Sequence, residues 1–221
     1  MNSTQLETLV NRGYQIKIGE YISQGFEVFK KYPSNFVGFF GLTALVAVVL
    51  NLIPILGGIA SSIIGAPLGA GFTFVVLAII RNQPFVFQDF FKGLNNKYFL
   101  QIFLISLVGG AITALGILLL IIPGIYIAVS YSFAVQIAID WELDFWEALE
   151  TSRKLISKNW FSMFGFLLVL TMINIGGILL LGIGIFFTAP ITICALIIAY
   201  NDILGRTSDS EPVDSWGTSE I

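Results

Sequence analysis

The sequence predicts an all-α integral membrane protein that crosses the bilayer six times. Of its 221 residues, 56% are apolar and only 11% are charged, whereas about 25% of the residues of a soluble domain are charged. The charged residues are also segregated, because none lies in residues 32–80, 98–139 or 159–201. A soluble fold cannot bury three apolar runs of this length, whereas a bilayer accommodates them.

Each apolar run is long enough for two crossings and too short for three, since one transmembrane helix needs roughly 20 residues. Each run also contains helix-breaking residues near its middle. A kink inside one helix, lining a cavity, is the alternative interpretation of Pro123-Gly124. We expect three hairpins, at about residues 33–80, 98–139 and 160–201, with turns at Pro54, Gly57, Gly58, Pro123, Gly124, Gly182 and Gly184.

The distribution of lysine and arginine predicts that both ends of the chain are cytoplasmic. The four segments outside the apolar runs hold all eleven Lys and Arg residues, and the predicted turns hold none. The positive-inside rule then assigns both termini and both long connections to the cytoplasm. The first 31 residues lack the short basic start and apolar core of a cleavable signal peptide.

We divide the chain into three parts. A polar N-terminal segment (1–15) is followed by a six-helix membrane domain (16–205) and by an acidic tail (206–221). The tail is rich in Ser, Thr and acidic residues, and we expect it to be disordered.

The segments that precede the three hairpins have the pattern of amphipathic helices. In residues 16–32 apolar side chains recur at helical spacing, Phe26 and Phe29 among them, and residues 85–98 and 144–160 show similar stripes. We expect each segment to lie in the cytoplasmic interface of the membrane. Four aromatic residues would act as interfacial anchors: Tyr32, Tyr98, Trp141 and Trp160.

Weak internal similarity suggests that one unit, an amphipathic helix followed by a hairpin, occurs three times. The string GILLL occurs at 116–120 and again at 177–181. Chance matches within an apolar alphabet are the alternative explanation. Repeats of this kind would share one orientation, unlike the inverted repeats of many alternating-access transporters.

The sequence offers little for catalysis or metal binding. Histidine is absent and Cys194 is the one cysteine, which excludes His- or Cys-ligated metal sites and nucleophiles with a His base. Nothing in the sequence predicts a phosphate loop or a nucleic-acid surface. We therefore predict no enzymatic activity, cofactor or metal. A membrane enzyme would need acid–base groups from the cytoplasmic edge: Asp140, Glu142 or Asp202.

Four polar side chains inside the apolar runs are candidate intramembrane contacts. We expect Asn51 and Asn174 to form interhelical hydrogen bonds, each worth on the order of 1 kcal/mol, with a polar cavity or substrate contact as the alternative. Tyr126 and Ser130 share one helix face, while the next polar residues lie on another. Because no continuous polar stripe results, a pore lining is not favoured.

Two stretches, IPGIYIAVSYSFAVQIAID and FWEALETSRKLISKNWFSMFGFLL, carry a family resemblance. They resemble a group of uncharacterised bacterial and archaeal membrane proteins that look related to the membrane domain of some glycerophosphodiester phosphodiesterases. The match covers roughly residues 115–203 well and the first half of the chain loosely. It implies a six-helix membrane domain and little more. We expect the protein to lie in the bacterial plasma (inner) membrane. No hydrolase domain is present in this sequence, so phosphodiesterase activity is not implied.

The leading functional hypothesis is a non-enzymatic membrane protein that organises lipid or acts as a scaffold for a membrane partner. Its expected partners are membrane lipid and either another membrane protein or a second copy of the chain. The amphipathic helices would insert among lipid headgroups.

The alternative hypothesis is a permease or channel for a small or apolar solute. Mitochondrial carriers show that three two-helix repeats can transport. In those carriers, however, charged residues follow the kinking prolines, whereas Pro54, Pro123 and Pro190 are followed here by ILGG, GIYI and ITIC. A membrane enzyme is the third hypothesis.

Overall fold

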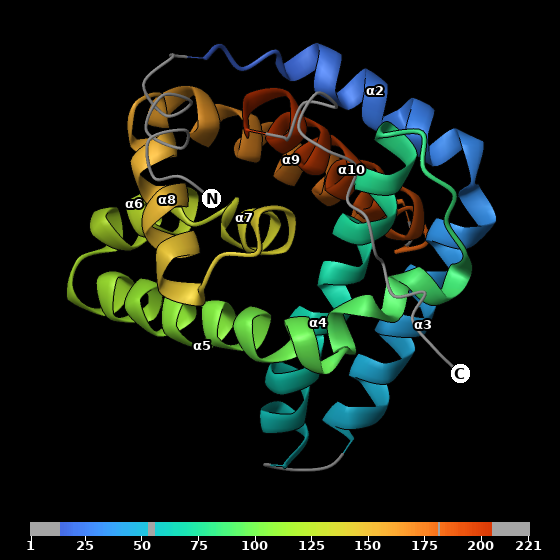
Figure 1. The fold of residues 1–221 in the computed structure, drawn as a ribbon, viewed down its shortest axis with the longest axis horizontal. Helices are drawn as coiled ribbons and strands as arrows, with labels where there is room; N and C mark the ends of the chain where they lie inside the picture. Colours follow the sequence, from blue (N-terminus) through green and yellow to red (C-terminus); the bar gives the residue numbers. More distant parts are fainter. Residues whose placement is uncertain (1–13, 53–55, 181, 205–221) are drawn as a thin grey trace.

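A computed structural model describes residues 14–52, 56–180 and 182–204 (Figure 1). The predicted tail (206–221), Pro54 and most of the predicted N-terminal segment lie outside the described residues. The described part is all-helical and contains six spans that are long and apolar enough to cross a membrane. This confirms the predicted fold class at the level of helix type and number of candidate spans.

The described helices follow one another with short connections. Six candidate spans are formed by α3, α4, α5, α6 together with α7, α9 and α10. The remaining elements are α2, α8 and a 3₁₀ helix, η1. In chain order the elements are α2 (Ile18–Lys31), α3 (Pro33–Asn51), α4 (Leu56–Ile80), η1 (Phe87–Leu94), α5 (Asn96–Leu119), α6 (Ile121–Ser130), α7 (Ala134–Trp141), α8 (Phe145–Ser157), α9 (Trp160–Leu179) and α10 (Ile185–Leu204).

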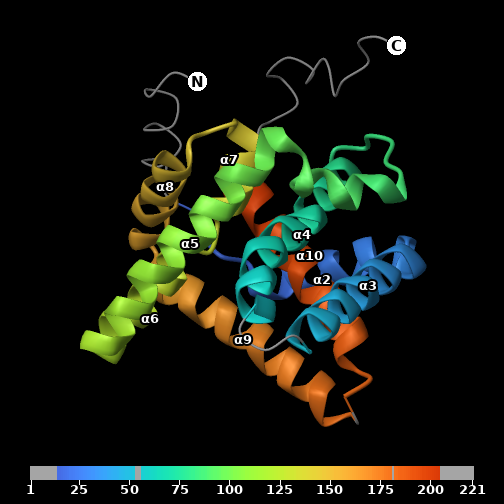
Figure 2. The ribbon, with the colours of Figure 1, turned by 90° about the horizontal axis from the view of Figure 1, so that it is seen from below.

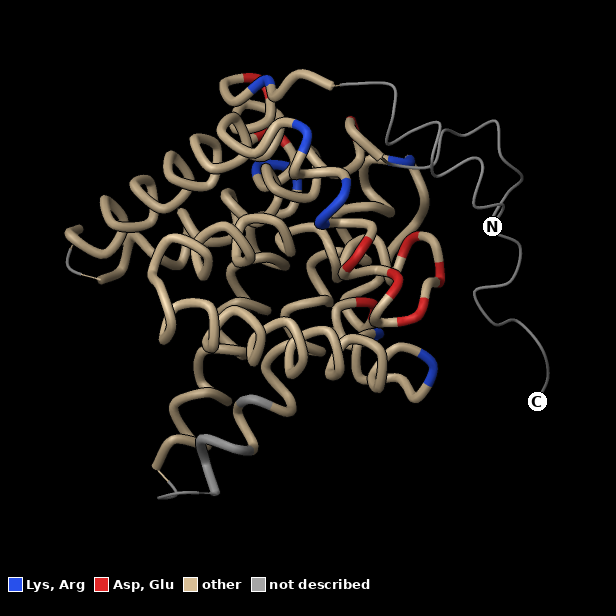
Figure 3. Tube along the Cα trace, turned by 90° about the vertical axis from the view of Figure 1, so that its left-hand side faces the viewer, with Lys and Arg blue, Asp and Glu red and all other residues tan. Residues whose placement is uncertain are grey.

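Charged residues gather on one side of the molecule, and the helix ends that project from the other side carry none (Figure 3). The far ends of the pairs α5–α6 and α9–α10 point toward opposite lower corners of Figure 2. Large apolar side chains are highly exposed near these ends, including Leu118 and Ile122 at 81% and Leu179 at 78%. Water disfavours such a surface, whereas lipid solvates it.

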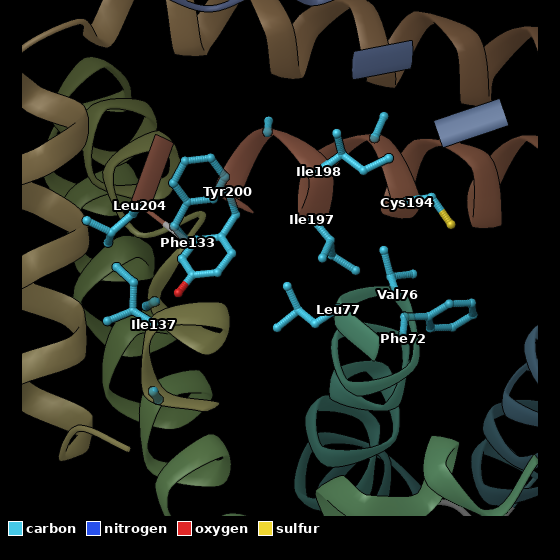
Figure 4. Packing of buried hydrophobic residues seen from close by; sticks show 14 of the residues in the cluster. Phe72, Val76, Leu77, Phe133, Ile137, Cys194, Ile197, Ile198, Tyr200 and Leu204 are labelled. Atoms are coloured by element: carbon cyan, nitrogen blue, oxygen red, sulfur yellow. The ribbon is translucent and has the colours of Figure 1, made fainter. Parts of the chain in front are cut away.

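Helix α10 is the centre of the hydrophobic core. Its sequence is apolar on every side, as expected of a helix with neighbours all round. Figure 4 shows α4 and the Phe133–Ile137 region along one side of α10, the first near Cys194 and Ile197 and the second near Tyr200 and Leu204. The ring of Tyr200 packs edge-to-face on Phe133 at 5.7 Å between centroids. Cys194 is fully buried in this core, as its apolar surroundings in the sequence predict.

Helices α5 and α6 are separated by one residue, Leu120, whose backbone is extended at φ −154° and ψ 126°. Pro123 and Gly124 therefore lie in the first turn of α6, where a missing N–H costs little. Gly124 allows close packing, because a Cβ on Gly116 would lie 2.9 Å from its Cα. The chain thus breaks just before the predicted pair, and the glycine lets α6 approach α5.

The other predicted turn residues lie at helix ends. Gly182 joins α9 to α10 with φ +73°, a conformation that favours glycine. Gly184 follows it and packs against Gly177 of α9. Since α4 begins at Leu56, Gly57 and Gly58 lie within its first turn.

The fourth candidate span is not one continuous helix. Residues 131–133 form a turn between α6 and α7. Tyr126 and Ser130 both lie in α6, but the helical register ends after Ser130, so the expectation of one unbroken helix through the later polar residues is wrong.

Helix α2 packs along α10. A Cβ on Gly25 would lie 2.8 Å from the backbone nitrogen of Ala195, so the two backbones touch near the middle of α10. At one end of this contact the hydroxyl of Tyr21 donates a hydrogen bond to the carboxylate of Asp202. At the other end the centroid of the Phe29 ring lies 6.3 Å from that of the Phe187 ring.

The segments η1 and α8 also contact spans near their midpoints. The fully buried Phe90 of η1 stacks on Phe39 at 4.4 Å, and its carbonyl lies against Gly71 of α4. Leu149 of α8 lies beside Gly109 of α5.

The apolar faces of α2, η1 and α8 bear on their predicted insertion among lipid headgroups. Each segment uses its main apolar face inside the protein, and exposed side chains such as Phe26 (47%) and Trp146 (56%) lie outside these contacts. Tertiary packing therefore satisfies most of the amphipathic pattern. The interfacial position of these segments stays a prediction.

We predict that Gly25→Ala destabilises the fold by roughly 1–3 kcal/mol, because the added methyl group overlaps the α10 backbone. The matched control is Gly19→Ala in the same helix, where no atom lies within 4 Å of the added carbon. Alanine is the better helix former, so the control should be neutral or slightly stabilising. Thermal unfolding in mild detergent measures both, and equal melting temperatures would contradict the α2–α10 contact.

Candidate functional site

An ion pair joins the ends of three spans at the charged side of the molecule. Arg81 follows α4 and makes a bidentate contact with Asp140 of α7, with N–O distances of 2.7 and 2.9 Å. From α10, Tyr200 donates to the same carboxylate at 2.8 Å, and Asn201 accepts from Arg81 at 3.4 Å. We call these four residues the Arg81 cluster.

The Arg81 cluster is largely removed from water. The Asp140 side chain is 2% exposed and that of Arg81 21%. Burial opposes the charge on Arg81, but hydrogen bonds and the charge of Asp140 outweigh it, so the pKa of Arg81 is raised. Desolvating two charges is costly, and bidentate geometry with additional hydrogen bonds offsets that cost. The carboxylate of Asp140 accepts three hydrogen bonds, an arrangement typical of a structural ion pair.

The other acidic residues at this edge also have partners. Glu142 accepts from Lys97 at 2.6 Å, and Asp202 accepts from Tyr21 at 2.6 Å. Within the described ranges, no group of three or more acidic or cysteine side chains is placed to hold a metal ion.

A serine from α8 satisfies the backbone at the break in the fourth span. The hydroxyl of Ser152 donates to the carbonyl of Ser130 at 2.7 Å and accepts from the amide of Phe133 at 3.3 Å. Ser152 is fully buried. Because freed backbone groups are costly at membrane depth, this hydroxyl stabilises the break, together with turn hydrogen bonds such as that from the Ser132 amide to the Val129 carbonyl at 3.2 Å.

An aromatic groove lies between α6, the end of α8 and the start of α9. Tyr126 stacks on Trp160 at 5.8 Å, its hydroxyl lies 2.7 Å from that of Ser157, and Trp160 donates to its carbonyl at 3.2 Å. The groove has a volume of about 680 Å³. It is lined by Ile122, Ile125, Tyr126, Ser157, Lys158, Asn159, Trp160, Phe161 and Phe164.

The predicted polar contacts are hydrogen bonds in three different places. Asn51 donates to Ser61 of α4 at 3.2 Å, and Asn174 donates to Thr192 of α10 at 2.9 Å. Ser130 donates to the carbonyl of Tyr126, one turn earlier in α6. The two asparagines therefore each link the two helices of one pair.

The predicted aromatic anchors have different surroundings. Tyr32 is 40% exposed and packs edge-to-face against Phe85. Tyr98 is 7% exposed and lies against Phe74. Trp141 is partly buried, packed against the core, and Trp160 forms a wall of the aromatic groove. The structure thus brings together Trp160 and Tyr126, which the sequence analysis assigned to separate roles.

Comparison with known proteins adds no relative. No protein family matches the chain, no curated protein matches it, and no solved structure matches it. The family resemblance suggested by the sequence stays a prediction.

Two features were missed by sequence reasoning. Ser152 gave no signal, since a serine on an amphipathic helix is unremarkable. The ion pair of Arg81 and Asp140 did leave a signal in the sequence, because each residue is the first charged residue after an apolar run. In a protein with few charges, opposite signs at equivalent span ends indicate a pairing.

We predict that Asp140→Asn destabilises the protein by about 3–5 kcal/mol, because it leaves the buried charge of Arg81 without its partner. The control is Glu142→Gln, which breaks an ion pair whose side chains are 57% and 55% exposed and should change stability by less than about 1 kcal/mol. Unfolding by sodium dodecyl sulfate in mixed micelles measures both. Similar losses in the two variants would show that the Arg81 cluster is not a stabilising ion pair.

Proposed function

We propose that the protein spans the bacterial plasma membrane six times, as three helix pairs with both ends of the chain in the cytoplasm. Two observations support this topology. Charged residues gather on one side of the fold (Figure 3), and all Lys and Arg residues lie outside the apolar runs. The positive-inside rule makes the charged side cytoplasmic.

We also propose that the three pairs descend from one repeated unit. The two GILLL strings have a similar structural role: their first glycines, Gly116 and Gly177, each pack against a later glycine, Gly124 in α6 and Gly184 in the turn before α10. Similar glycine contacts, at offsets of eight and seven residues, support a repeat more strongly than matching letters in an apolar sequence do.

The function that the geometry supports best is non-enzymatic binding of membrane lipid. The aromatic groove is the observation that carries this proposal. Its apolar wall suits an acyl chain, while Ser157, Lys158 and Asn159 offer polar groups to a headgroup. Tyr and Trp favour the region between hydrocarbon and water.

The surroundings of the groove support lipid as its occupant. Ile122 and Phe161 line it and are 81% and 84% exposed, so its wall continues into the apolar surface that the spans present. Each methylene group of an acyl chain that is buried in the groove contributes about 0.8 kcal/mol to the free energy of lipid binding. Organisation of lipid, or binding of a membrane partner or second copy over the same surface, would act through this contact.

A permease is the second candidate, favoured by the discontinuous fourth span. Broken helices often form substrate sites in transporters, where unwound backbone binds the solute. Here Ser152 occupies the backbone groups of the break. Because these backbone groups already have a partner in the protein, they do not bind a solute, and the lipid-binding proposal is favoured over the permease.

Cysteine labelling on a Cys194→Ala background tests the topology. Ile183→Cys lies in the connection between α9 and α10, and Gln83→Cys lies between α4 and η1. In spheroplasts, a membrane-impermeant maleimide should label Ile183→Cys directly and Gln83→Cys only after lysis. The opposite labelling pattern would show that the termini face the periplasm, and labelling of both cysteines before lysis would contradict the six-span topology.

Native mass spectrometry of the protein released from its membrane into mild detergent tests lipid binding. Ile125→Trp fills the groove, and loss of contact with two methylene groups should weaken lipid retention by about tenfold. Met172→Trp is the control, on an exposed part of α9 outside the groove. Equal lipid retention in both variants would eliminate the groove as the binding site.

A further inference from the structure

A pair of lysines ends α2 directly before the candidate span α3. Lys30 and Lys31 are both exposed, and α3 begins two residues later at Pro33. Lysine side chains at the end of a membrane span extend toward the lipid headgroups. Both ammonium groups can therefore reach lipid phosphates.

Neither lysine has an ionic partner within the described ranges. Glu27 lies one helical turn before the pair and is exposed, and it forms no ion pair with either lysine. Ion pairs with N–O distances of 2.6–3.7 Å form at six other described cations: Lys17, Arg81, Lys92, Lys97, Arg153 and Lys154. The two adjacent cations at the end of α2 are therefore available to an anion.

Exposed apolar side chains at the start of η1 lie beside the lysines. The ring of Tyr32 packs edge-to-face on Phe85, with 4.9 Å between centroids, and Figure 1 shows the connection from α4 to η1 beside the end of α2. Val86 and Phe87 are 58% and 39% exposed. The ring of Phe87 also lies 6.4 Å from that of Phe39, in the second turn of α3. These apolar side chains are thus level with the first turns of the span.

We give the name lysine patch to this surface, which comprises Lys30, Lys31, Tyr32, Phe85, Val86 and Phe87. Its charge and its position identify the class of ligand. An anionic lipid offers a phosphate to the lysines and acyl chains to the apolar side chains, and it is present wherever a span enters the membrane. An acidic protein would neutralise the lysines, but it would have to displace lipid from the start of α3.

We propose that the lysine patch binds an anionic phospholipid in preference to a zwitterionic one. Lys30 and Lys31 donate charge-assisted hydrogen bonds to its phosphate, and its acyl chains contact Val86 and Phe87. A zwitterionic lipid binds less tightly, because the ammonium group of its headgroup is repelled by the lysines. The inference goes beyond the proposed function and does not rest on it, since the patch shares no residue with the aromatic groove.

Lipid titration of the purified full chain in mild detergent, followed by native mass spectrometry, tests this preference. The probes are dioleoyl phosphatidylglycerol and dioleoyl phosphatidylcholine, which share acyl chains and differ in headgroup charge. The glycerol lipid should bind roughly 30-fold more tightly, since each lysine near a lipid phosphate contributes about fivefold. This preference should shrink when the ionic strength is raised from about 0.1 M to about 1 M, because salt screens exposed charges.

Lys30→Gln and Lys31→Gln should each lower the affinity for the glycerol lipid by about fivefold and leave that for the choline lipid unchanged. The matched control is Lys154→Gln, which removes a lysine that is 61% exposed and paired with Glu150, and it should bind lipid normally. Thermal unfolding of each variant verifies the fold.

The same titration in an Ile125→Trp background separates the lysine patch from the aromatic groove. Filling the groove should leave the preference for the glycerol lipid unchanged, and loss of the preference there would overturn the proposal. Equal affinity for the two lipids, or equal losses in the Lys30→Gln, Lys31→Gln and Lys154→Gln variants, would also overturn it and leave an acidic protein as the partner of the lysines. Lipid retention that Ile125→Trp does not change would count against the groove alone.

Discussion

The fold depends on the contact between Arg81 and Asp140, because it joins the ends of three candidate spans. Arg81 follows α4, Asp140 lies at the end of α7, and Tyr200 and Asn201 lie near the end of α10. Spans in lipid gain little from burying apolar surface against each other, since lipid is equally apolar. A charge pair that is largely shielded from water therefore provides specificity that apolar packing does not. It determines which helix ends meet.

The second constraint is that backbone polar groups at membrane depth must find partners within the protein. The break between α6 and α7 frees such groups, and Ser152 pairs with two of them. Helix α8 is thereby tied to the middle of the fourth span, as α2 is tied to α10 through Gly25. The connecting helices are consequently part of the packed structure, and they hold the spans in place.

Sequence patterns predicted the features that depend on local composition. Charge-free runs determine the candidate spans, and glycine with proline determines where helices end, as Gly182 and Pro123 illustrate. Periodicity also identified apolar faces on α2, η1 and α8, but it cannot tell lipid from protein, because both offer an apolar surface. The position of Phe90 in the sequence pattern is equally consistent with a side chain that faces lipid and with one that is buried in the protein core. The position of Arg81 after a charge-free run indicates an acidic partner, but Asp140 and Asp202 both follow such runs, so the choice of Asp140 depends on contacts between residues far apart in the chain.

These contacts limit how the protein meets lipid. An amphipathic helix senses lipid packing with a free apolar face, whereas the main apolar faces of α2 and η1 lie on α10 and α4. Wedge-like insertion would then depend on isolated side chains such as Phe26. A groove that is apolar along its wall and polar at one end requires no free helix face. Because the apolar faces of the connecting helices already pack against spans, the proposed lipid binding falls to the spaces between helices, and the aromatic groove is such a space.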